Sequence, residues 1–531
     1  MFPIDFFWRA AQHWPDRIAI DSPEGTISYG ALATQVDALA AALVAIDPTA
    51  QSRVGICATN SAEHIAALLA VLACGKVWVP LNPKSTRPEI RRIVDATEPS
   101  ILVIDTTCTK LLEDAPGSRI YCGPLLDGPI TGDTLTPTIA ELSARHLGAP
   151  RPSLELPLDA TQAIKFTGGT TGTPKGVMQT YRAWMANITN QIHVWGFDEH
   201  ERYIVAAPIT HGTSTYILPI LAQGGCHVVL AGGGAEAVRT AFKERGGTTC
   251  FMPPTLVYML MALPNASRQD FPQLRRLIYG GAPMPPEKIR EVRDFFGPVL
   301  GTTYGQTEAP QILTVMRPED FEDPRNWAAV GRTTWFSDVA IMAPDGRFLP
   351  SGEVGEVVAR GDLLMSGYWR LPEKTAETLV AGWLHTGDRG LIDARGYLYL
   401  KDRLKDMLIT GGFNVYPVDV ENALGQHPAV HECAVFGIPD DKWGEAVQAA
   451  VQLRPGLQAT EAELISHVRE LLGPVHTPKH IHFYDSLPRS SVGKVLKIAL
   501  RERAMVPAVL NAPIALTVLT ELTPPIPLTH S

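Results

Sequence analysis

A short loop rich in glycine and threonine has the residue types that most clearly suggest a ligand-binding site. Residues 164–180 read IKFTGGTTGTPKGVMQT and place four glycines and five threonines around Lys175. Glycine lets the backbone come close to a ligand, and hydroxyls with exposed N–H groups donate the hydrogen bonds that phosphate oxygens accept. The loop therefore indicates a phosphate site, with a flexible surface linker as the alternative. It is not a Walker A loop, because Val177 stands where Ser or Thr would hold magnesium.

The elements that must position this loop read as an α/β fold. Short apolar segments rich in β-branched residues alternate with amphipathic ones, a pattern typical of mostly parallel, buried sheets with helices on both faces. The loop follows an apolar lead-in, QAIKF. Strands are predicted at 53–59, 77–81, 101–105, 227–231, 248–253 and 275–281. The opening residues predict a short amphipathic helix.

The pattern changes twice toward the C-terminus. Segments 353–361 and 396–403 predict strands of a smaller β-rich unit. After Arg403 a second α/β pattern begins, with a strand expected at 432–438 and a helix at 460–472. We therefore place a domain boundary near 402–406, between an N-terminal domain over 1–402 and a C-terminal domain over 406–505, with a tail over 506–531.

Composition narrows the class of protein. The chain has 531 residues and is 45% hydrophobic, so it can build several cores. Its net charge of −9 argues against a basic surface that would bind nucleic acid. Its seven cysteines lack C-x-x-C spacing, which favours a reducing compartment. The apolar stretch 64–81 is broken at Gly75 and Lys76 and is too short to span a bilayer. We expect a soluble cytoplasmic protein with neither a membrane nor a nucleic-acid partner.

Five ordered motifs carry a family resemblance. They are FTGGTTGTPKG (166–176), TTYGQTEAP (302–310), GWLHTGDRG (382–390), KDRLKDMLITGGFNVYPVDVENAL (401–424) and PRSSVGKVLK (488–497). Together they resemble the acyl-adenylate-forming, AMP-binding superfamily of acyl- and aryl-CoA synthetases, adenylation domains and luciferases, over about residues 10–500. The resemblance implies an α/β fold: a large N-terminal domain of two α/β subdomains plus a small β-barrel, followed by a smaller, mobile α+β domain.

The same resemblance implies that ATP and Mg²⁺ take part. Joining a carboxylate to the α-phosphate of ATP brings two anions together, so the site needs cations and hydrogen-bond donors. The residues assigned to the β- and γ-phosphates are Thr167, Gly169, Thr170, Thr171, Gly172 and Lys175. Glu308 resembles the family's magnesium ligand, with Thr307 as the neighbouring phosphate contact.

Nucleotide recognition and catalysis are also implied by matching positions. Gly280, Gly281, Ala282 and Pro283 match the segment that lies against adenine, and Tyr304, next to Gly305, matches the residue on its other face. Asp388 would accept hydrogen bonds from both ribose hydroxyls, and Arg403 would reach ribose or phosphate. Lys494 matches the catalytic lysine that bridges the acid and the α-phosphate. Lys405 matches the family's hinge position, so the resemblance implies a hinge at 403–405 about which a mobile C-terminal domain turns.

The expected acid has no α-amino group. The stretch APITHGTSTYI (207–217) lacks the acidic residue with which amino-acid-activating domains bind an ammonium. His211 stands where acyl- and aryl-CoA ligases have an aromatic gate, although a lone histidine is more often structural. The expected pocket wall comprises His211, Thr213, Gly280 and Gln306. An aryl, an alicyclic and a fatty acid all remain open.

The expected acceptor is the thiol of coenzyme A. Gly411, Gly412 and Trp443 match positions along the family's acceptor tunnel. Two departures stand out: Gly168 replaces a common serine, and 475–479 reads VHTPK where many CoA ligases have aromatic–Lys–x–Pro–Lys. An amine acceptor, giving an amide, is therefore the alternative. Three other functions are less favoured: loading of a separate carrier protein, a luciferase-like oxygenase reaction, and a binding module without activity. A zinc site at His427 and His431 is also less favoured. The protein could form an oligomer.

Overall fold

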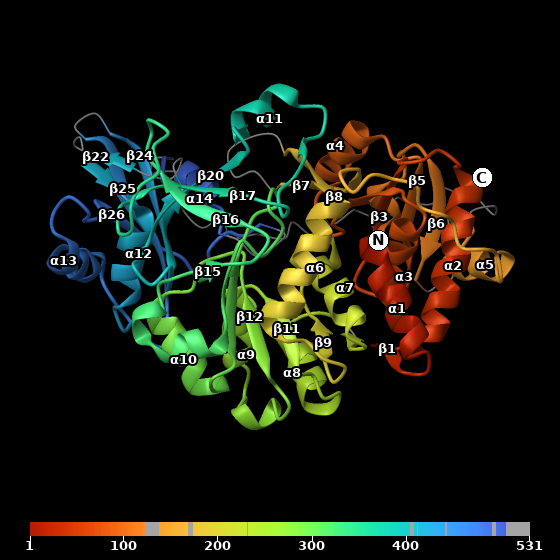
Figure 1. Cartoon of the computed structure of the whole chain (residues 1–531). Helices are drawn as coiled ribbons and strands as arrows, with labels where there is room; N and C mark the ends of the chain where they lie inside the picture. The colour runs from red at the N-terminus through yellow and green to blue at the C-terminus, as the bar shows by residue number, and fades with distance from the viewer. Residues whose placement is uncertain are drawn as a thin grey trace, which may run out of the picture.

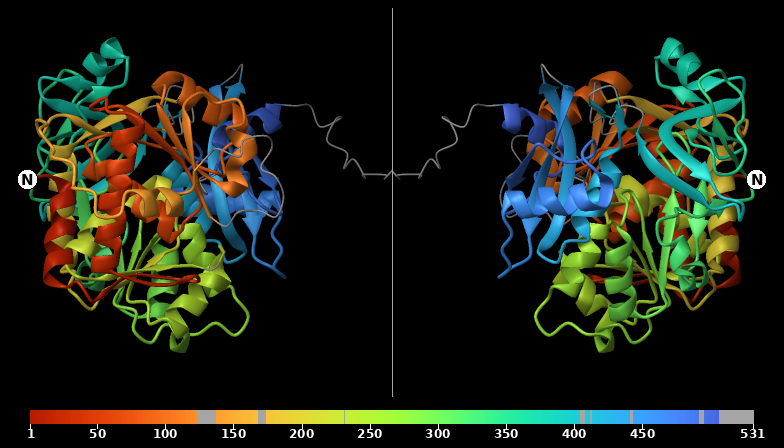
Figure 2. Two further views of the ribbon diagram at one scale, coloured as in Figure 1. Left: turned by 90° about the vertical axis from the view of Figure 1, so that its right-hand side faces the viewer. Right: turned by 90° about the vertical axis from the view of Figure 1, so that its left-hand side faces the viewer.

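The computed structural model describes residues 1–123, 137–167, 174–230, 232–403, 408–410, 413–440, 443–490 and 495–505. Figure 1 shows two large sheets with their helices, a smaller antiparallel sheet, and a C-terminal sheet set to one side. Figure 2 gives the same separation from two further directions, with the blue C-terminal strands beside the body of the molecule. The predicted α/β fold with a large N-terminal part and a small C-terminal part is confirmed.

The first large sheet has the strand order β18-β8-β7-β4-β3-β5-β6. The central strands run parallel, and β8 and β18 add antiparallel at the edge. All five residues of β5 and all four of β4 are buried, as expected for a sheet covered on both faces. Its strands are β3 Arg53–Cys57, β4 Val77–Pro80, β5 Ile101–Asp105, β6 Ser118–Cys122, β7 Thr161–Phe166, β8 Gly176–Thr180 and β18 Gly367–Tyr368.

The second large sheet has the order β15-β14-β13-β12-β11-β9-β10-β1-β2. Its six inner strands are parallel, so their carboxyl ends meet at one edge. The strands are β1 Ile18–Ser22, β2 Gly25–Ser28, β9 Arg202–Val205, β10 Cys226–Val229, β11 Thr249–Met252, β12 Arg276–Tyr279, β13 Leu300–Tyr304, β14 Thr314–Met316 and β15 Arg332–Thr333.

Two antiparallel sheets follow. One contains β16 Asp338–Met342, β17 Gly355–Arg360, β19 Leu379–Val380, β20 Trp383–Ile392 and β21 Leu398–Arg403. The C-terminal sheet contains β22 Leu408–Thr410, β23 Phe413–Val415, β24 Val430–Asp440, β25 Gly444–Leu453 and β26 His480–Phe483. The C-terminal strands and helices form hydrophobic clusters of their own, which include Val435, Val447 and Leu464.

Helices cover the faces of these sheets. Many begin at a serine or threonine whose hydroxyl accepts from the first turn, as Ser61 does from the amide of His64. The helices are α1 Pro3–His13, α2 Tyr29–Ile46, α3 Ala62–Ala73, α4 Arg87–Thr97, α5 Ile139–Arg145, α6 Tyr181–Trp195, α7 Ser214–Ala222, α8 Ala235–Glu244, α9 Pro254–Met261, α10 Pro286–Phe296, α11 Pro372–Thr378, α12 Pro417–Gly425, α13 Glu461–Leu472 and α14 Lys497–Met505. Short helical segments are η1 Thr106–Leu111, η2 Ile209–Thr213, η3 Arg268–Asp270, η4 Pro318–Glu322 and η5 Pro324–Asn326.

The predicted elements agree closely with these bounds. The amphipathic N-terminal segment is α1, and the stretch 64–81 is α3, a turn at Gly75 with φ of +72°, and β4. Among the described residues one helix, α2, is long and apolar enough to cross a membrane; it packs against α3 and α5 within the structure.

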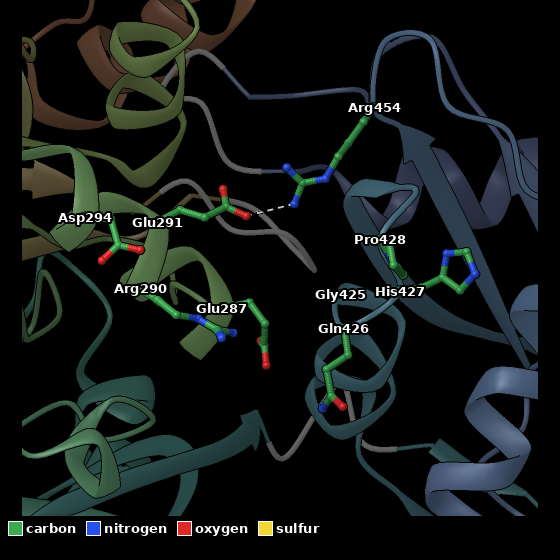
Figure 3. Close-up of a pocket in the computed structure, with 9 residues that line it drawn as sticks. All are labelled: Glu287, Arg290, Glu291, Asp294, Gly425, Gln426, His427, Pro428 and Arg454. Carbon is green, nitrogen blue, oxygen red and sulfur yellow. Dashed lines mark hydrogen bonds and ion pairs between the residues drawn. The ribbon is translucent and has the colours of Figure 1, made fainter. Parts of the chain in front are cut away.

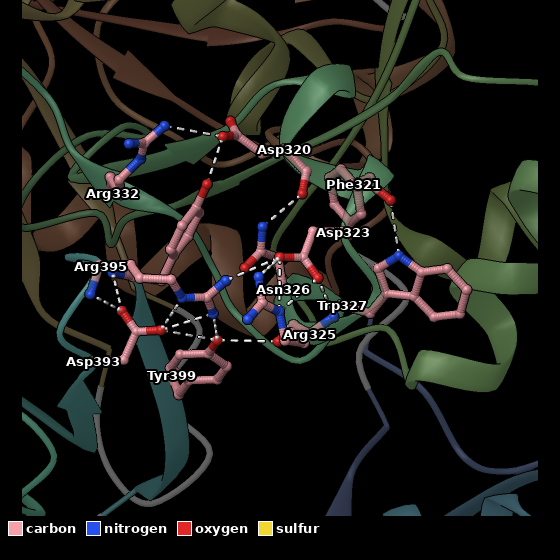
Figure 4. Close-up of polar contacts among 11 residues, drawn as sticks. Asp320, Phe321, Asp323, Arg325, Asn326, Trp327, Arg332, Asp393, Arg395 and Tyr399 are labelled. Atoms are coloured by element: carbon pink, nitrogen blue, oxygen red, sulfur yellow. Dashed lines mark hydrogen bonds and ion pairs between the residues drawn. The ribbon is translucent and has the colours of Figure 1, made fainter.

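A polar seam fastens the β20–β21 hairpin to the second large sheet (Figure 4). Asp320 Oδ1 accepts from Tyr397 Oη at 2.7 Å and from Arg332 at 3.0 Å. Asp323, which lies between η4 and η5, accepts from Arg395 at 3.1 Å, so this segment contacts the hairpin at two points. Because Asp320 and Tyr397 are both buried, these hydrogen bonds fix the hairpin position.

Replacing the central acid of the seam is expected to destabilise the protein. Asp320→Ala leaves the buried Tyr397 hydroxyl without its acceptor, at a cost of roughly 1–3 kcal/mol, which thermal melting would detect. Asp345→Ala, at an exposed hairpin turn, is the control and should change stability by less than about 0.5 kcal/mol. Equal melting of the two variants would show that the seam contributes nothing.

Candidate functional site

The candidate site gathers at the carboxyl ends of strands from both large sheets. β7 and β8 flank the glycine-rich loop, and β12 and β13 end at Tyr279 and Tyr304 in the neighbouring sheet. β20 of the small antiparallel sheet brings Asp388 to the same place, since its carboxylate bonds Tyr304. This edge is where open α/β sheets bind ligands.

The two ends of the glycine-rich loop are joined. The amide of Thr167 donates to the carbonyl of Lys175 at 3.0 Å, and the amide of Lys175 donates to Thr167 Oγ1 at 3.5 Å. This pairing continues the β7–β8 ladder to the point where the loop leaves it. The expected phosphate contacts Gly169, Thr170, Thr171 and Gly172 lie outside the described residues.

Glu308 and Lys175 meet through a tyrosine that the sequence analysis did not select. Tyr368 Oη donates to Glu308 Oε1 at 2.8 Å and accepts from Lys175 Nζ at 3.1 Å. Burial and the adjacent carboxylate both raise the pKa of Tyr368, so the phenol stays protonated and can donate. Tyr368 therefore joins a carboxylate and an ammonium beside the loop through one hydroxyl group.

The arrangement fits a magnesium ion held together with phosphates. Among the residues that the structure describes, Glu308 Oε2 has no hydrogen-bond partner, and the side chain is partly exposed. No group of three described His, Cys, Asp or Glu side chains could enclose a metal by itself. One carboxylate plus substrate oxygens is the usual Mg²⁺ arrangement, so Glu308 would hold the ion and Thr307 would lie next to it.

Asp388 is a buried carboxylate with two short hydrogen bonds. Its Oδ2 accepts from Tyr304 Oη at 2.7 Å and from Gln306 Nε2 at 2.6 Å, and the side chain is 7% exposed. Gln306 also donates to the carbonyl of Thr386 at 2.9 Å. Three expected site residues therefore meet at one carboxylate, and Gln306, which the sequence assigned to the acid pocket, contacts Asp388.

The segment expected to lie against adenine follows β12. Gly281 has φ of +80° and open space where a side chain would stand, so the backbone of Gly280 to Pro283 can approach a flat ring. Gly305 is crowded instead: an added Cβ would come within 2.5 Å of the Gln311 backbone. The chain therefore needs glycine there to turn after Tyr304.

His211 and Thr213 lie in η2, where His211 breaks the helical backbone with φ of −121° and ψ of −136°. His211 Nδ1 bonds Thr210 Oγ1 at 2.9 Å, and Thr213 is buried. Behind them three rings stack: Tyr203 on Tyr216 and Tyr216 on Phe251, each pair 5.3 Å apart between centroids. The Phe251 ring lies close to both Gly212 and Gly280, so Phe251 packs against the segments that the sequence assigns to the acid pocket, with Tyr216 behind it.

Several residues that the sequence assigns to the site lie apart from it or fall outside the described residues. Arg403 stands opposite Asp388 in the β20–β21 ladder. Lys405, Gly411, Gly412, Lys494 and the tail are outside the described residues. Trp443 belongs to the C-terminal part, is 37% exposed, and has Lys479 Nζ 4.7 Å from its ring centroid.

A crevice of about 230 Å³ separates α10 from the C-terminal part (Figure 3). Arg454 Nη2 bonds Glu291 Oε1 across it at 2.9 Å. The remaining lining is polar, with Glu287 and Asp294 on one side and Gln426 and His427 on the other. No residue assigned to the candidate site lines this crevice.

Two family models and two relatives match the chain over most of its length. A family model described as AMP-binding enzyme matches residues 7–369, and one described as AMP-binding enzyme C-terminal domain matches residues 419–494. The chain is 33% identical to a medium/long-chain fatty-acid–CoA ligase, FadD8, of Mycobacterium tuberculosis, over 90% of this chain and 86% of the relative. It is 34% identical to a feruloyl-CoA synthase of Amycolatopsis, over 92% and 98%.

Two solved structures superpose closely on this chain. The amide bond synthetase McbA of Marinactinospora thermotolerans superposes with a TM-score of 0.85 at 32% identity, covering 94% of this chain and 99% of McbA. ATP-bound MatB of Rhodopseudomonas palustris also gives 0.85, at 29% identity and with 95% and 99% covered. The likeness extends over both the N-terminal and the C-terminal part.

A single methyl group should disturb the acid end. An added Cβ on Gly212 would stand 2.7 Å from Phe251 Cε1, so Gly212→Ala must displace that ring. We expect a lower melting temperature, consistent with an overpacking cost of roughly 1–3 kcal/mol. Gly425→Ala, where nothing lies within 4 Å, is the control. Adding Phe251→Leu should restore part of the loss, and a double variant no more stable than Gly212→Ala would contradict the clash.

Proposed function

Because the chain belongs to the AMP-binding enzyme family, we propose that it is an ATP-dependent carboxylic acid ligase that works through an acyl-AMP intermediate. The first step joins acid and ATP with release of pyrophosphate. The second transfers the acyl group to the thiol of coenzyme A. The acid has no α-amino group.

The observation that carries the first step is the Lys175–Tyr368–Glu308 arrangement beside the glycine-rich loop. A bound Mg²⁺ would offset phosphate charge. Lys175, placed by Tyr368, would bind the phosphates, and Glu308 would present its Oε2 to the ion. An acid carboxylate oxygen then attacks the α-phosphorus, and the bond to the pyrophosphate oxygen breaks. We assign Lys494 the bridge between the acid and the α-phosphate.

Asp388 is the proposed ribose ligand. Tyr304 and Gln306 hold its Oδ2, and in this proposal the carboxylate accepts from the ribose hydroxyls. The hydrogen bonds from these two neutral donors keep the carboxylate oriented toward the nucleotide.

The second step needs an acceptor. The thiol sulfur attacks the acyl carbon, the bond to AMP breaks, and the thiol proton passes to solvent. Relatives named as CoA ligases support CoA. The exposed ring of Trp443 with Lys479 above it offers a face for a base and a cation for a phosphate. In this proposal the C-terminal part turns about residues 403–405 between the two steps.

An amine acceptor is the second candidate, and the segment 475–477 favours it. Thr477 is 1% exposed, and its hydroxyl donates to the carbonyl of Gly473 at 2.8 Å. Val475 packs on the C-terminal core, and His476 Nδ1 is buried. These side chains turn inward where a CoA ligase would offer cations to an anionic acceptor. The amide bond synthetase McbA is a structural neighbour at 32% identity.

One product analysis separates the two acceptors. The protein is incubated with ATP, Mg²⁺ and a panel of aryl, alicyclic and fatty acids, with CoA and amino acids offered together, and the products are identified by mass spectrometry. A thioester is the expected product, whereas an amide with CoA ignored would establish the second candidate. Absence of acid-dependent AMP across the panel would refute the adenylation step itself.

Removing the proposed ribose ligand should weaken nucleotide binding. Asp388→Ala loses a charged hydrogen-bond acceptor worth roughly 1.5–3 kcal/mol, so the Kd for ATP should rise about ten- to a hundredfold by calorimetry. Asp338→Ala removes an exposed acid of the same small sheet and serves as the control. An unchanged Kd in the Asp388 variant would take this residue away from the ribose.

A further inference from the structure

A buried lysine lies between the phosphate-loop strand and the acid end of the site. Lys165 belongs to β7, two residues before Thr167, and is 7% exposed. Its Nζ lies 4.9 Å from the ring centroid of Trp78 and 5.3 Å from that of Trp184. Two aromatic faces therefore enclose the amine beneath α6.

The amine reaches the turn that frames the acid pocket. Lys165 Nζ donates to Ser214 Oγ at 2.7 Å, and Ser214 Oγ donates to the carbonyl of His211 at 2.7 Å. His211 is the residue at which the helical backbone of η2 breaks. The chain of hydrogen bonds thus ties a non-helical turn to the strand that leads into the loop.

The same enclosure also touches the metal side of the site. Trp184 Nε1 donates to Gln179 Oε1 at 3.1 Å, and Gln179 Nε2 donates to the carbonyl of Thr307 at 2.8 Å. Thr307 precedes Glu308, the proposed magnesium ligand. The aromatic wall around Lys165 is therefore fixed to the third segment of the site.

Packing alone gives little reason for an amine at this position. Among the described residues Lys165 forms no ion pair, and burial lowers its pKa to about 7. An unpaired ammonium is expensive to bury, and an apolar side chain of similar length would fit between two indole rings at lower cost. Groups kept at such a cost are often functional.

We propose that Lys165 is a positioning residue for adenylation: it holds the His211–Ser214 turn, and with it the acid, at a fixed place relative to the phosphate loop. This inference rests on the proposed function. A displacement of about 1 Å at a reacting group can cost a hundredfold in rate, so an internal tether has a large effect on the chemistry.

Lys76 provides a matched control. It is also buried, also donates to a serine hydroxyl at 2.7 Å, in Ser52, and its pKa is also lowered by burial. It stands at the amino end of β4 and bonds the carbonyls of Asp47 and Thr49, away from the candidate site. Its contacts tie one connection together, which is a structural role.

The test compares Lys165→Met, Ser214→Ala, their double variant and Lys76→Met. For Lys165→Met we expect kcat/KM for the acid, measured as pyrophosphate release with octanoate and benzoate as probes, to fall about ten- to a hundredfold. The Kd for ATP should change less than about twofold, and the melting temperature should hold or rise, because a costly buried amine is gone. The double variant should be no worse than the single ones, because both break one chain. Lys76→Met should melt earlier and keep its acid kinetics.

Crystal structures of the wild type and Lys165→Met add a readout that does not depend on activity. A shift of His211 by about 1 Å or more, with the β7 backbone in place, is the expected result. An unmoved turn, additive losses in the double variant, or a fall in melting temperature with equal loss of acid and ATP affinity would overturn the proposal. Wild type without acid-dependent pyrophosphate release would instead refute the proposed function and leave the crystallographic comparison to decide the role of Lys165.

Discussion

The register of three adjacent strands is the constraint on which the site depends. In the β7–β8–β18 ladder, Val177 stands opposite Lys165 on one side and opposite Tyr368 on the other. A slip of one residue would turn every side chain of the shifted strand to the opposite face. The phenol would then leave Glu308 and Lys175, and the amine of Lys165 would leave Ser214. One alignment of backbone hydrogen bonds thus fixes both ends of the site.

Buried polar groups then join the other segments to this ladder. Gln179 reaches from β8 to the carbonyl of Thr307, and Gln306 reaches from the same turn to Asp388 on β20. The seam through Asp320 and Tyr397 keeps the β20–β21 hairpin close enough for that contact. Each of these bonds is internal, so each resists loss more strongly than a surface contact would. The segments around Asp388 and Glu308 are therefore parts of one hydrogen-bonded frame.

Much of this frame can be predicted from the sequence, and the contacts that cannot be predicted have identifiable physical reasons. Ordered motifs and apolar segments predict the strands, the family and Asp388, because these signals are local. The contact of Tyr368 cannot be predicted in this way, because its partner Glu308 is 60 positions away and only strand pairing brings the two residues together. Phe251 reads as an ordinary buried strand residue. Lys165 stands out as a cation in an apolar strand, yet its meaning depends on Ser214, 49 positions later.

The crevice beneath α10 has a consequence for how such proteins diversify. The C-terminal part has hydrophobic clusters of its own, and at this crevice it contacts α10 through a partly exposed ion pair between Arg454 and Glu291. Ion pairs of that kind contribute about 0–1 kcal/mol. Substitutions in the C-terminal sheet can therefore accumulate with little effect on the frame that binds nucleotide and acid. Selection can exchange the acceptor while the activation chemistry is inherited intact.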